Sequence, residues 1–226
     1  MHPRNGLADM LIIVSTHNRP GITGLCLYNL LRNKSPESKV TVMDDHSTLM
    51  SDVWFKNFGF ELEKVPDGKH YAIAKLEYFL ASKHEFLLSL DSDMFVAQDF
   101  DLKISKAWMS AIRHYYFGGG YISRLHDPKD IERHDTFCLI PSTIGGCLFL
   151  SRILAKKLLD ELQLNSGTLR MYDPIIKRMS EKIVCPPASV VQHIGIYEGQ
   201  NTDMNNISGE YADDFLETFS VGPIKL

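Results

Sequence analysis

The chain has 226 residues, of which 44% are hydrophobic and 23% are charged, and its formal net charge at pH 7 is −4. This composition is typical of a globular domain and excludes a disordered or fibrous protein. A pI of about 6.1 gives no reason to expect general affinity for nucleic acid or for an anionic membrane. A domain of this size buries a core without disulfides, and no CxxC pair occurs, so we expect reduced, buried thiols. The four cysteines are Cys26, Cys138, Cys147 and Cys185.

The sequence shows no targeting or membrane-spanning pattern. Its first residues lack the apolar region of a signal peptide. No stretch reaches the roughly 18 apolar residues that a membrane helix needs. We therefore expect a cytoplasmic protein, unless this chain is part of a longer membrane-anchored one.

Strand and helix patterns alternate along the first half of the chain. Short apolar runs predict buried strands, and apolar residues three or four positions apart predict helices. Because parallel strands need long crossovers, this alternation indicates a mostly parallel sheet. The expected strands lie at residues 10–15, 39–43, 60–65 and 85–90, and the expected helices at residues 21–33, 48–57 and 69–83.

The second half is less regular. Its polar, charged stretch at residues 127–136 predicts a surface loop, and the sequence at residues 183–194 predicts extended backbone. Ser151 and Asp173 are suited to cap the helices that follow them. We expect helices at residues 99–116, 151–162 and 173–180, a strand at residues 144–150, and a polar tail over the last thirty residues.

Three of the expected strands in the first half end in polar residues. Sheets of this kind bind ligands beyond the carboxyl ends of their strands, so the three clusters should converge on one edge of the sheet. The clusters are Ser15-Thr16-His17-Asn18, Asp44-Asp45-His46-Ser47 and Asp91-Ser92-Asp93.

The acidic triplet is the strongest chemical signal. Asp91 and Asp93 follow a nearly all-apolar run at residues 86–90, which places both carboxylates at the lip of the core. Two carboxylates at this spacing can reach one hard cation, and oxygen ligands suit Mg²⁺ or Mn²⁺, which keep open positions for phosphate oxygens. A D-x-D sequence is common by chance and can be a solvated turn, but its place after a buried strand favours a metal site.

Two candidates accompany the triplet on the same edge. Asp45 could accept an N–H of a nucleotide base, or it could cap the next helix. His17 could stack on a base or contact a phosphate, or it could be an ordinary loop histidine. Neither alternative is decided by these residues alone.

The second half supplies the other candidates. A neutral imidazole at His193 could be a third metal ligand, or a half-buried histidine without that role. Asp173 could act as a general base as well as a helix cap. Gly145 and Gly146 would let a substrate approach the backbone, or would form a tight bend.

The order of three motifs identifies a family. They read V-S-T-H-N-R-P at residues 14–20, V-M-D-D-H-S-T at residues 42–48 and L-D-S-D at residues 90–93. Together they resemble the nucleotide-binding half of the inverting glycosyltransferases of family 2, and G-G-C-L-F-L-S-R at residues 145–152 is similar to the family's strand before the acceptor helix. His46 departs from the pattern, because the family has glycine after the paired acids.

The resemblance implies a GT-A fold of the α/β class. This is a Rossmann-like, mostly parallel central sheet flanked by helices, with a smaller mixed acceptor-side region. We expect a single domain over residues 1–226. Its nucleotide-binding half would span about residues 10–98, its acceptor-binding half about residues 99–200, and its C-terminal tail residues 201–226.

The resemblance also implies roles for single residues. The metal ligands would be Asp93 first, with Asp91 between metal and ribose, and His193 as a further ligand. Asp173 stands where the family has its acidic base, although the paired acids common there are missing. The remaining substrate-binding residues would be Ser15, Thr16 and His17 at the nucleoside, Asp45 at the base, Lys75 at the diphosphate, and Ser92, Gly145 and Gly146 beside the donor.

These features predict a glycosyltransferase. It would use Mn²⁺ or Mg²⁺ and a nucleotide-diphosphate sugar, with a UDP-sugar favoured, and transfer the sugar to a hydroxyl acceptor such as a glycan. Inversion is favoured; a retaining enzyme would instead need the leaving phosphate near the acceptor, and Asp173 would then be a binding residue. A haloacid-type phosphatase is disfavoured because the triplet comes late in the chain and is followed by Phe95. A sugar-phosphate nucleotidyltransferase would need a glycine-rich basic loop after the first strand, and residues 15–20 are not such a loop. This enzyme class and a non-catalytic nucleotide-sugar-binding module are the alternative functions.

Overall fold

The computed structural model describes residues 9–56, 58–111, 117–122, 127–141, 146–165 and 173–194. Within these ranges a nine-stranded sheet runs through the molecule in the order β3-β2-β1-β4-β9-β6-β10-β8-β7, and β5 and β11 form a separate two-stranded sheet. The strands are β1 (Met10–Thr16), β2 (Lys39–Asp44), β3 (Glu61–Lys64), β4 (Phe86–Asp91), β5 (Met94–Val96), β6 (Phe117–Gly118), β7 (Glu132–Arg133), β8 (Cys138–Pro141), β9 (Cys147–Ser151), β10 (Lys182–Cys185) and β11 (Val191–His193).

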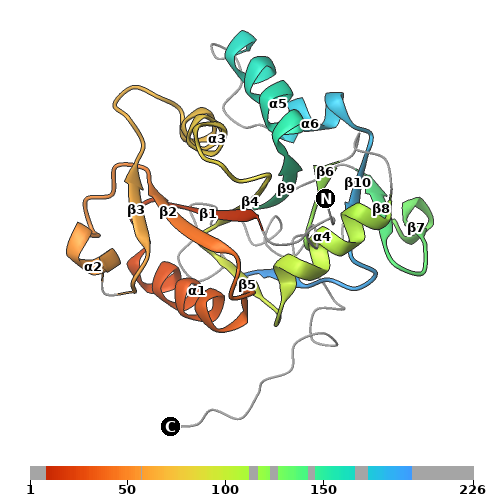
Figure 1. The fold of residues 1–226 in the computed structure, drawn as a ribbon, viewed down its shortest axis with the longest axis horizontal. Coiled ribbons are helices and arrows are strands. Elements are labelled where there is room, and N and C mark those ends of the chain that lie inside the picture. The colour runs from red at the N-terminus through yellow and green to blue at the C-terminus, as the bar shows by residue number, and fades with distance from the viewer. Residues whose placement is uncertain are drawn as a thin grey trace, which may run out of the picture.

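Helices cover both sides of this sheet. In Figure 1, α3 and α5 lie side by side on one side of the first strands, and α1 lies on the other. The described helices are α1 (Pro20–Asn33), α2 (Asp52–Lys56), α3 (Tyr71–Ala81), α4 (Phe100–Ser110), α5 (Arg152–Leu164), α6 (Asp173–Met179) and the short 3₁₀ helix η1 (Pro128–Asp130).

The first four strands form a parallel block, as the sequence predicts. β1 is parallel to both β2 and β4, and β2 is parallel to β3. Residues 10–14 of β1 are almost fully buried, because helices cover both faces of the sheet around that strand. Beyond β4 the pairing becomes mixed: β9 is antiparallel to both β4 and β6, while β6 and β10 are parallel. The predicted division into a parallel sheet and a mixed region is confirmed.

Local signals set several helix boundaries. Pro20 opens α1, where its missing N–H costs nothing. His70 caps α3 by accepting the N–H of Ala72 on Nδ1 at 3.3 Å. Ser151 caps α5 as predicted, with its Oγ accepting the N–H of Leu154 at 3.5 Å. The four cysteines are free and buried, as expected.

The structure corrects two predictions of local structure. The helix expected at residues 48–57 is confined to α2. The loop expected at residues 127–136 contains η1 and β7, which pairs with β8. Residues 183–194 are largely extended, as predicted, and contribute to two strands, β10 in the large sheet and β11 in the small one. The C-terminal tail lies outside the described residues.

Candidate functional site

The ends of three strands meet at one edge of the parallel block. The register places Ser15 beside both Met43 and Asp91, and Thr16 beside Asp44. The three polar clusters therefore follow strands that end side by side, and their predicted convergence is confirmed. Every group described next lies in these strand ends, in the loops that follow them, or in contact with them.

The loops after β1 and β2 are bound to each other. Asn18 adopts a left-handed backbone conformation, with φ of 48°. Its N–H donates to the Oγ of Ser47 at 2.9 Å, and its Oδ1 accepts the N–H groups of Thr48 at 2.7 Å and Leu49 at 2.9 Å. One asparagine thus holds the turn that carries the second motif.

His17 and Asp45 lie next to each other in these joined loops. The Nδ1 of His17 donates to the carbonyl oxygen of Asp45, and the N–H of Asp45 donates to the carbonyl oxygen of Thr16 at 2.9 Å. Both side chains are half-buried. The imidazole is thereby fixed in orientation, while the carboxylate of Asp45 remains partly open to solvent.

Asp93 is the centre of a buried polar cluster. Its side chain is 5% exposed, and its Oδ2 accepts from Nη1 of Arg19 at 2.6 Å and lies 3.3 Å from Nε2 of His193. Burial alone would raise the pKa of Asp93, but the hydrogen bond and charge of His193 together with the guanidinium of Arg19 hold the pKa below its usual range. Asp93 is therefore an ionised carboxylate at neutral pH.

Backbone pairing brings His193 to this position. β11 is antiparallel to β5, with His193 opposite Met94, and the N–H of Ile194 donates to the carbonyl oxygen of Asp93 at 2.8 Å. A residue a hundred positions away from Asp93 is thus fixed beside its carboxylate. The sequence-based pairing of these two residues in one site is consistent with this geometry.

Asp91 ends β4 above a buried lysine. Nζ of Lys75, from α3, donates to the Oγ of Ser89 at 2.6 Å, and the lysine is 1% exposed. Burial raises the pKa of Asp91, and the charge of Lys75 is the largest effect that opposes this rise; burial in turn lowers the pKa of Lys75. Lys75 is therefore a buried residue whose charge acts on Asp91, and its expected contact with the diphosphate stays a prediction.

The side chains of this cluster suit a divalent cation whose ligands come partly from the protein and partly from a substrate. No group of three or more His, Cys, Asp or Glu side chains among the described residues is arranged to hold a metal alone. However, Oδ1 of Asp93 is buried and has no hydrogen-bond partner within the described part of the chain. Mg²⁺ is commonly held by one or two carboxylates plus substrate phosphates, for which this oxygen and the adjacent His193 are suitable.

Other predicted site residues are placed less directly. The Oγ1 of Thr16 is hydrogen-bonded to that of Thr23 at 3.0 Å, and the Oγ of Ser15 is buried, so these hydroxyls face the protein interior. Ser92 is fully buried, and its Oγ accepts from Nη2 of Arg19 at 3.4 Å. Asp173 begins α6, but its side chain lies outside the described residues.

Gly146 lies against the triplet. Its carbonyl oxygen accepts the N–H of Asp91 at 2.8 Å, and its φ is +64°. A Cβ at this position would lie 1.9 Å from Cε of Met94 and 3.1 Å from Oδ2 of Asp91. The glycine therefore allows the strand β9 to start directly beside Asp91, whereas Gly145 lies outside the described residues.

Sequence reasoning missed two residues of this cluster. Asn18 and Arg19 are part of the first motif, but no role was predicted for either. Arg19 contacts Asp93 across 74 positions of the chain. The position of Arg19 could have predicted this contact. The arginine follows a strand that ends beside the acidic triplet, and a guanidinium forms strong hydrogen bonds with a carboxylate.

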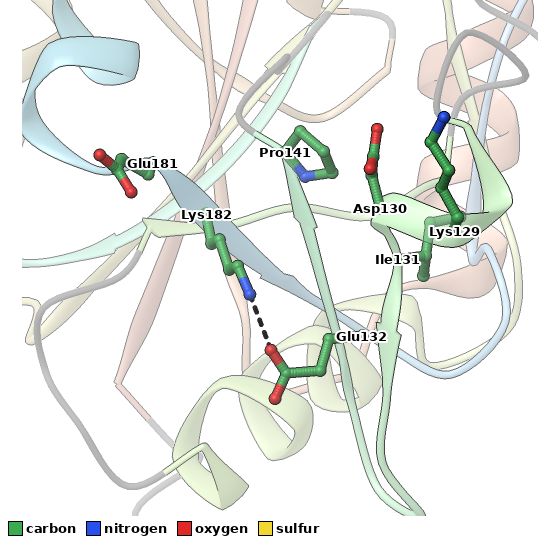
Figure 2. A pocket seen from close by; sticks show the side chains of 7 residues that line it. All are labelled: Lys129, Asp130, Ile131, Glu132, Pro141, Glu181 and Lys182. Atoms are coloured by element: carbon green, nitrogen blue, oxygen red, sulfur yellow. Dashed lines mark hydrogen bonds and ion pairs between the residues drawn. The ribbon is translucent and has the colours of Figure 1, made fainter.

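A separate groove lies at the other end of the sheet. It has a volume of about 590 Å³ and is lined by residues of η1, β7, β8 and β10, among them Glu132 and Lys182, whose ion pair of 2.7 Å is drawn in Figure 2. β10 runs in the same direction as β4, so Lys182, at its start, lies at the edge opposite Asp91. This groove does not belong to the triplet's site.

The parallel block, the mixed region beyond it and the acidic triplet at the strand ends define an α/β protein of GT-A type. The chain belongs to glycosyl transferase family 2, whose family model matches residues 11–176. Within the part of the chain that the structure describes, no helix is long and apolar enough to cross a bilayer.

One solved structure shows the same fold, and a second is similar to part of the chain. S. aureus TarS, residues 1–349, superposes with a TM-score of 0.57 at 15% identity, over 83% of this chain and 61% of that one. The mannosyltransferase PcManGT of Pyrobaculum calidifontis, solved with GDP-Man and Mn²⁺, gives a TM-score of 0.46 at 17% identity, over 66% of this chain and 46% of that one. This chain thus spans about half to three-fifths of the length of these structures. A comparison with curated proteins gives no match.

Proposed function

We propose that this chain is a metal-dependent glycosyltransferase. It takes a sugar from a nucleotide-diphosphate sugar, with a UDP-sugar favoured, and transfers it to a hydroxyl group of a glycan or similar acceptor. Membership of glycosyl transferase family 2 supports glycosyl transfer as the chemistry. The single observation that carries the proposal is the ionised, buried Asp93 with one unpartnered oxygen, on the same sheet edge as His17 and Asp45.

The residues divide the work of binding the donor. The carboxylate of Asp45 accepts an N–H of the base, and the fixed imidazole of His17 lies against the nucleoside. Asp93, with His193 beside it, holds Mn²⁺ or Mg²⁺, and Asp91 contacts the ribose and supports the same cation. A cation bound there supplies the positive charge that stabilises the diphosphate as it leaves the sugar.

The acceptor needs a base. In this proposal the carboxylate of Asp173 removes the proton of the acceptor hydroxyl while its oxygen attacks the anomeric carbon from the face opposite the diphosphate. This geometry inverts the configuration of the sugar. Asp173 begins α6, at the end of the chain region that the family model covers.

A nucleotide-sugar screen tests the proposal. UDP-, GDP- and dTDP-sugars are added with Mn²⁺, and thermal shift and nucleotide release are measured. We expect a stabilisation and a release of nucleotide that both require the metal. If no nucleotide sugar gives a metal-dependent response, the transferase proposal is wrong. Metal-dependent binding without turnover of any donor, across a panel of glycan acceptors, would favour the non-catalytic binding module.

Two variants assign the roles. Asp93→Ala is expected to abolish the metal-dependent shift, whereas Asp127→Ala, an exposed residue of the second half, should leave it intact. Full metal dependence in Asp93→Ala would exclude the triplet as the metal site.

Asp173→Asn should lose transfer and keep donor binding, so unchanged turnover in that variant would exclude Asp173 as the base.

A further inference from the structure

Arg19, in the loop before α1, is hydrogen-bonded to two residues of the acidic triplet. Its Nη1 donates to Oδ2 of Asp93 at 2.6 Å, and its Nη2 donates to the Oγ of Ser92 at 3.4 Å. The arginine side chain is 20% exposed and the carboxylate of Asp93 only 5%. The guanidinium is therefore the more solvent-accessible partner of a contact with the proposed metal ligand.

Both carboxylates of the triplet already lie near positive charge. Lys75 and Arg19 oppose the rise in the pKa of Asp91, and the charges of His193 and Arg19 lower the pKa of Asp93. Of these groups, Arg19 holds Asp93 by the shortest contact, 2.6 Å against 3.3 Å for His193. A buried carboxylate needs such a partner, and Arg19 supplies it from within the protein.

This arrangement opposes the binding of a divalent cation alone. The cation would add two positive charges beside the guanidinium bound to Oδ2 of Asp93, so repulsion opposes its binding to the same carboxylate. A nucleotide-sugar diphosphate carries two negative charges, which offset those of the cation when the two arrive together. Arginine binds phosphate oxygens well through its two-pronged hydrogen bonds, so the displaced guanidinium gains a new partner in the same step.

We propose that Arg19 is a placeholder for the metal. It neutralises Asp93 while no cation is bound, leaves that carboxylate when Mn²⁺ and the donor bind together, and then donates to the diphosphate. Arg19 thereby makes the binding of metal and nucleotide cooperative, so that neither binds well alone. This inference rests on the proposed function and adds a positioning residue to it.

The test measures Mn²⁺ affinity by calorimetry, with and without saturating UDP or GDP. In the native chain we expect weak Mn²⁺ binding alone and much tighter binding with the nucleotide. For Arg19→Gln we expect Mn²⁺ alone to bind at least about tenfold more tightly, because one positive charge beside Asp93 is gone. UDP should then tighten Mn²⁺ binding less than it does in the native chain.

Two comparison variants isolate the charge. Arg19→Lys keeps the positive charge, and its Mn²⁺ affinity should stay within about threefold of the native value. Arg32→Gln makes the same substitution at an exposed arginine in the last turn of α1, where the side chain contacts only Tyr28 among the described residues, and it should change nothing. A tightening in Arg32→Gln equal to that in Arg19→Gln would overturn the inference.

Further outcomes separate the inference from the proposed function. If the native chain binds no Mn²⁺ even with UDP or GDP, both fail. If it binds both ligands but Arg19→Gln shows unchanged or weaker Mn²⁺ affinity, only the placeholder role fails. If Arg19→Gln is too unstable for calorimetry, the Mn²⁺-induced rise in Tm is measured instead. That rise must be larger than in the native chain, and an equal or smaller rise overturns the inference.

Discussion

The two halves of this molecule differ in the burial of interacting charged groups: the parallel block holds a buried cluster, and the ion pairs described in the mixed region lie at the surface. In the parallel block, Lys75, Asp91 and Asp93 are buried or nearly so, and they act on one another across long stretches of chain. In the mixed region the charged pairs are exposed, such as Lys182 with Glu132, where both side chains are more than two-fifths accessible. Exposed pairs are screened by water and contribute little, whereas buried charges must be balanced and so impose a fixed geometry.

Among the described residues, two of the mixed region reach the polar site through pairing with the parallel block. His193 comes back through the pairing of β11 with β5, and Gly146 through the pairing of β9 with β4. The comparison shows that the parallel block builds the polar cluster and that later parts of the chain join it through strand pairing. Three substitutions, from the largest expected effect to the smallest, test this division.

Removal of the buried lysine should have the largest effect. Lys75→Met leaves Asp91 buried without its counter-charge, and we expect the free energy of unfolding to fall by about 3–5 kcal/mol. Lys182→Met removes one partner of the exposed pair in the mixed region and should cost at most about 1 kcal/mol. Urea denaturation of both variants at pH 7 measures the difference. Equal losses would contradict the contrast between the two halves.

The pH dependence of the same variant has a definite sign. Without Lys75, the pKa of Asp91 rises further, because burial raises it and the lysine opposed that rise. The folded state then holds a proton that the unfolded state releases above its ordinary pKa, so stability is present at low pH and is lost as pH rises. Lys75→Met should therefore be less destabilised at pH 5 than at pH 8. The opposite trend in urea titrations would show that Lys75 does not act on Asp91.

A substitution at one contact point between the halves should come second. Gly146→Ala forces a side chain into a left-handed backbone and against Met94, so we expect a loss of roughly 2–4 kcal/mol and weaker binding of Mn²⁺ with UDP. The matched control is Gly68→Ala, which has φ of +72° but open space around the new Cβ, and should cost roughly 1–2 kcal/mol with binding unchanged. Equal losses in both variants would argue against tight contact at Gly146.

The smallest effect is expected in the turn of the second motif. His46 has φ of 57°, a conformation that suits the glycine usual in the family, and its side chain is exposed with a weak ion pair to Asp67 of 3.6 Å. His46→Gly should remove the strain of a left-handed backbone at a residue with a side chain. Glycine also gains conformational entropy in the unfolded chain, which offsets part of this effect. We therefore expect the free energy of unfolding to rise by a few tenths to about 1 kcal/mol. A lower Tm would mean that the histidine side chain stabilises this turn.

The parallel block was predictable because its signals are local. Apolar runs and helical spacing located β1, α1, β2, α3 and β4, and the family motifs follow its strand ends. The mixed region was harder, because β6 and β7 have two residues each and β5 has three, too few for any periodicity to show. Their strand character comes from partners elsewhere in the chain, such as β8 for β7.

The sequence alone determined the family, the parallel block and the edge at which His17, Asp45 and the acidic triplet gather. It did so because strand patterns are local and parallel strands end together. Only the tertiary structure decided what surrounds each carboxylate. Lys75 is buried and its charge acts on Asp91, and Arg19 and His193 meet at Asp93, because packing brings together charges that are distant along the chain and buried charges need partners.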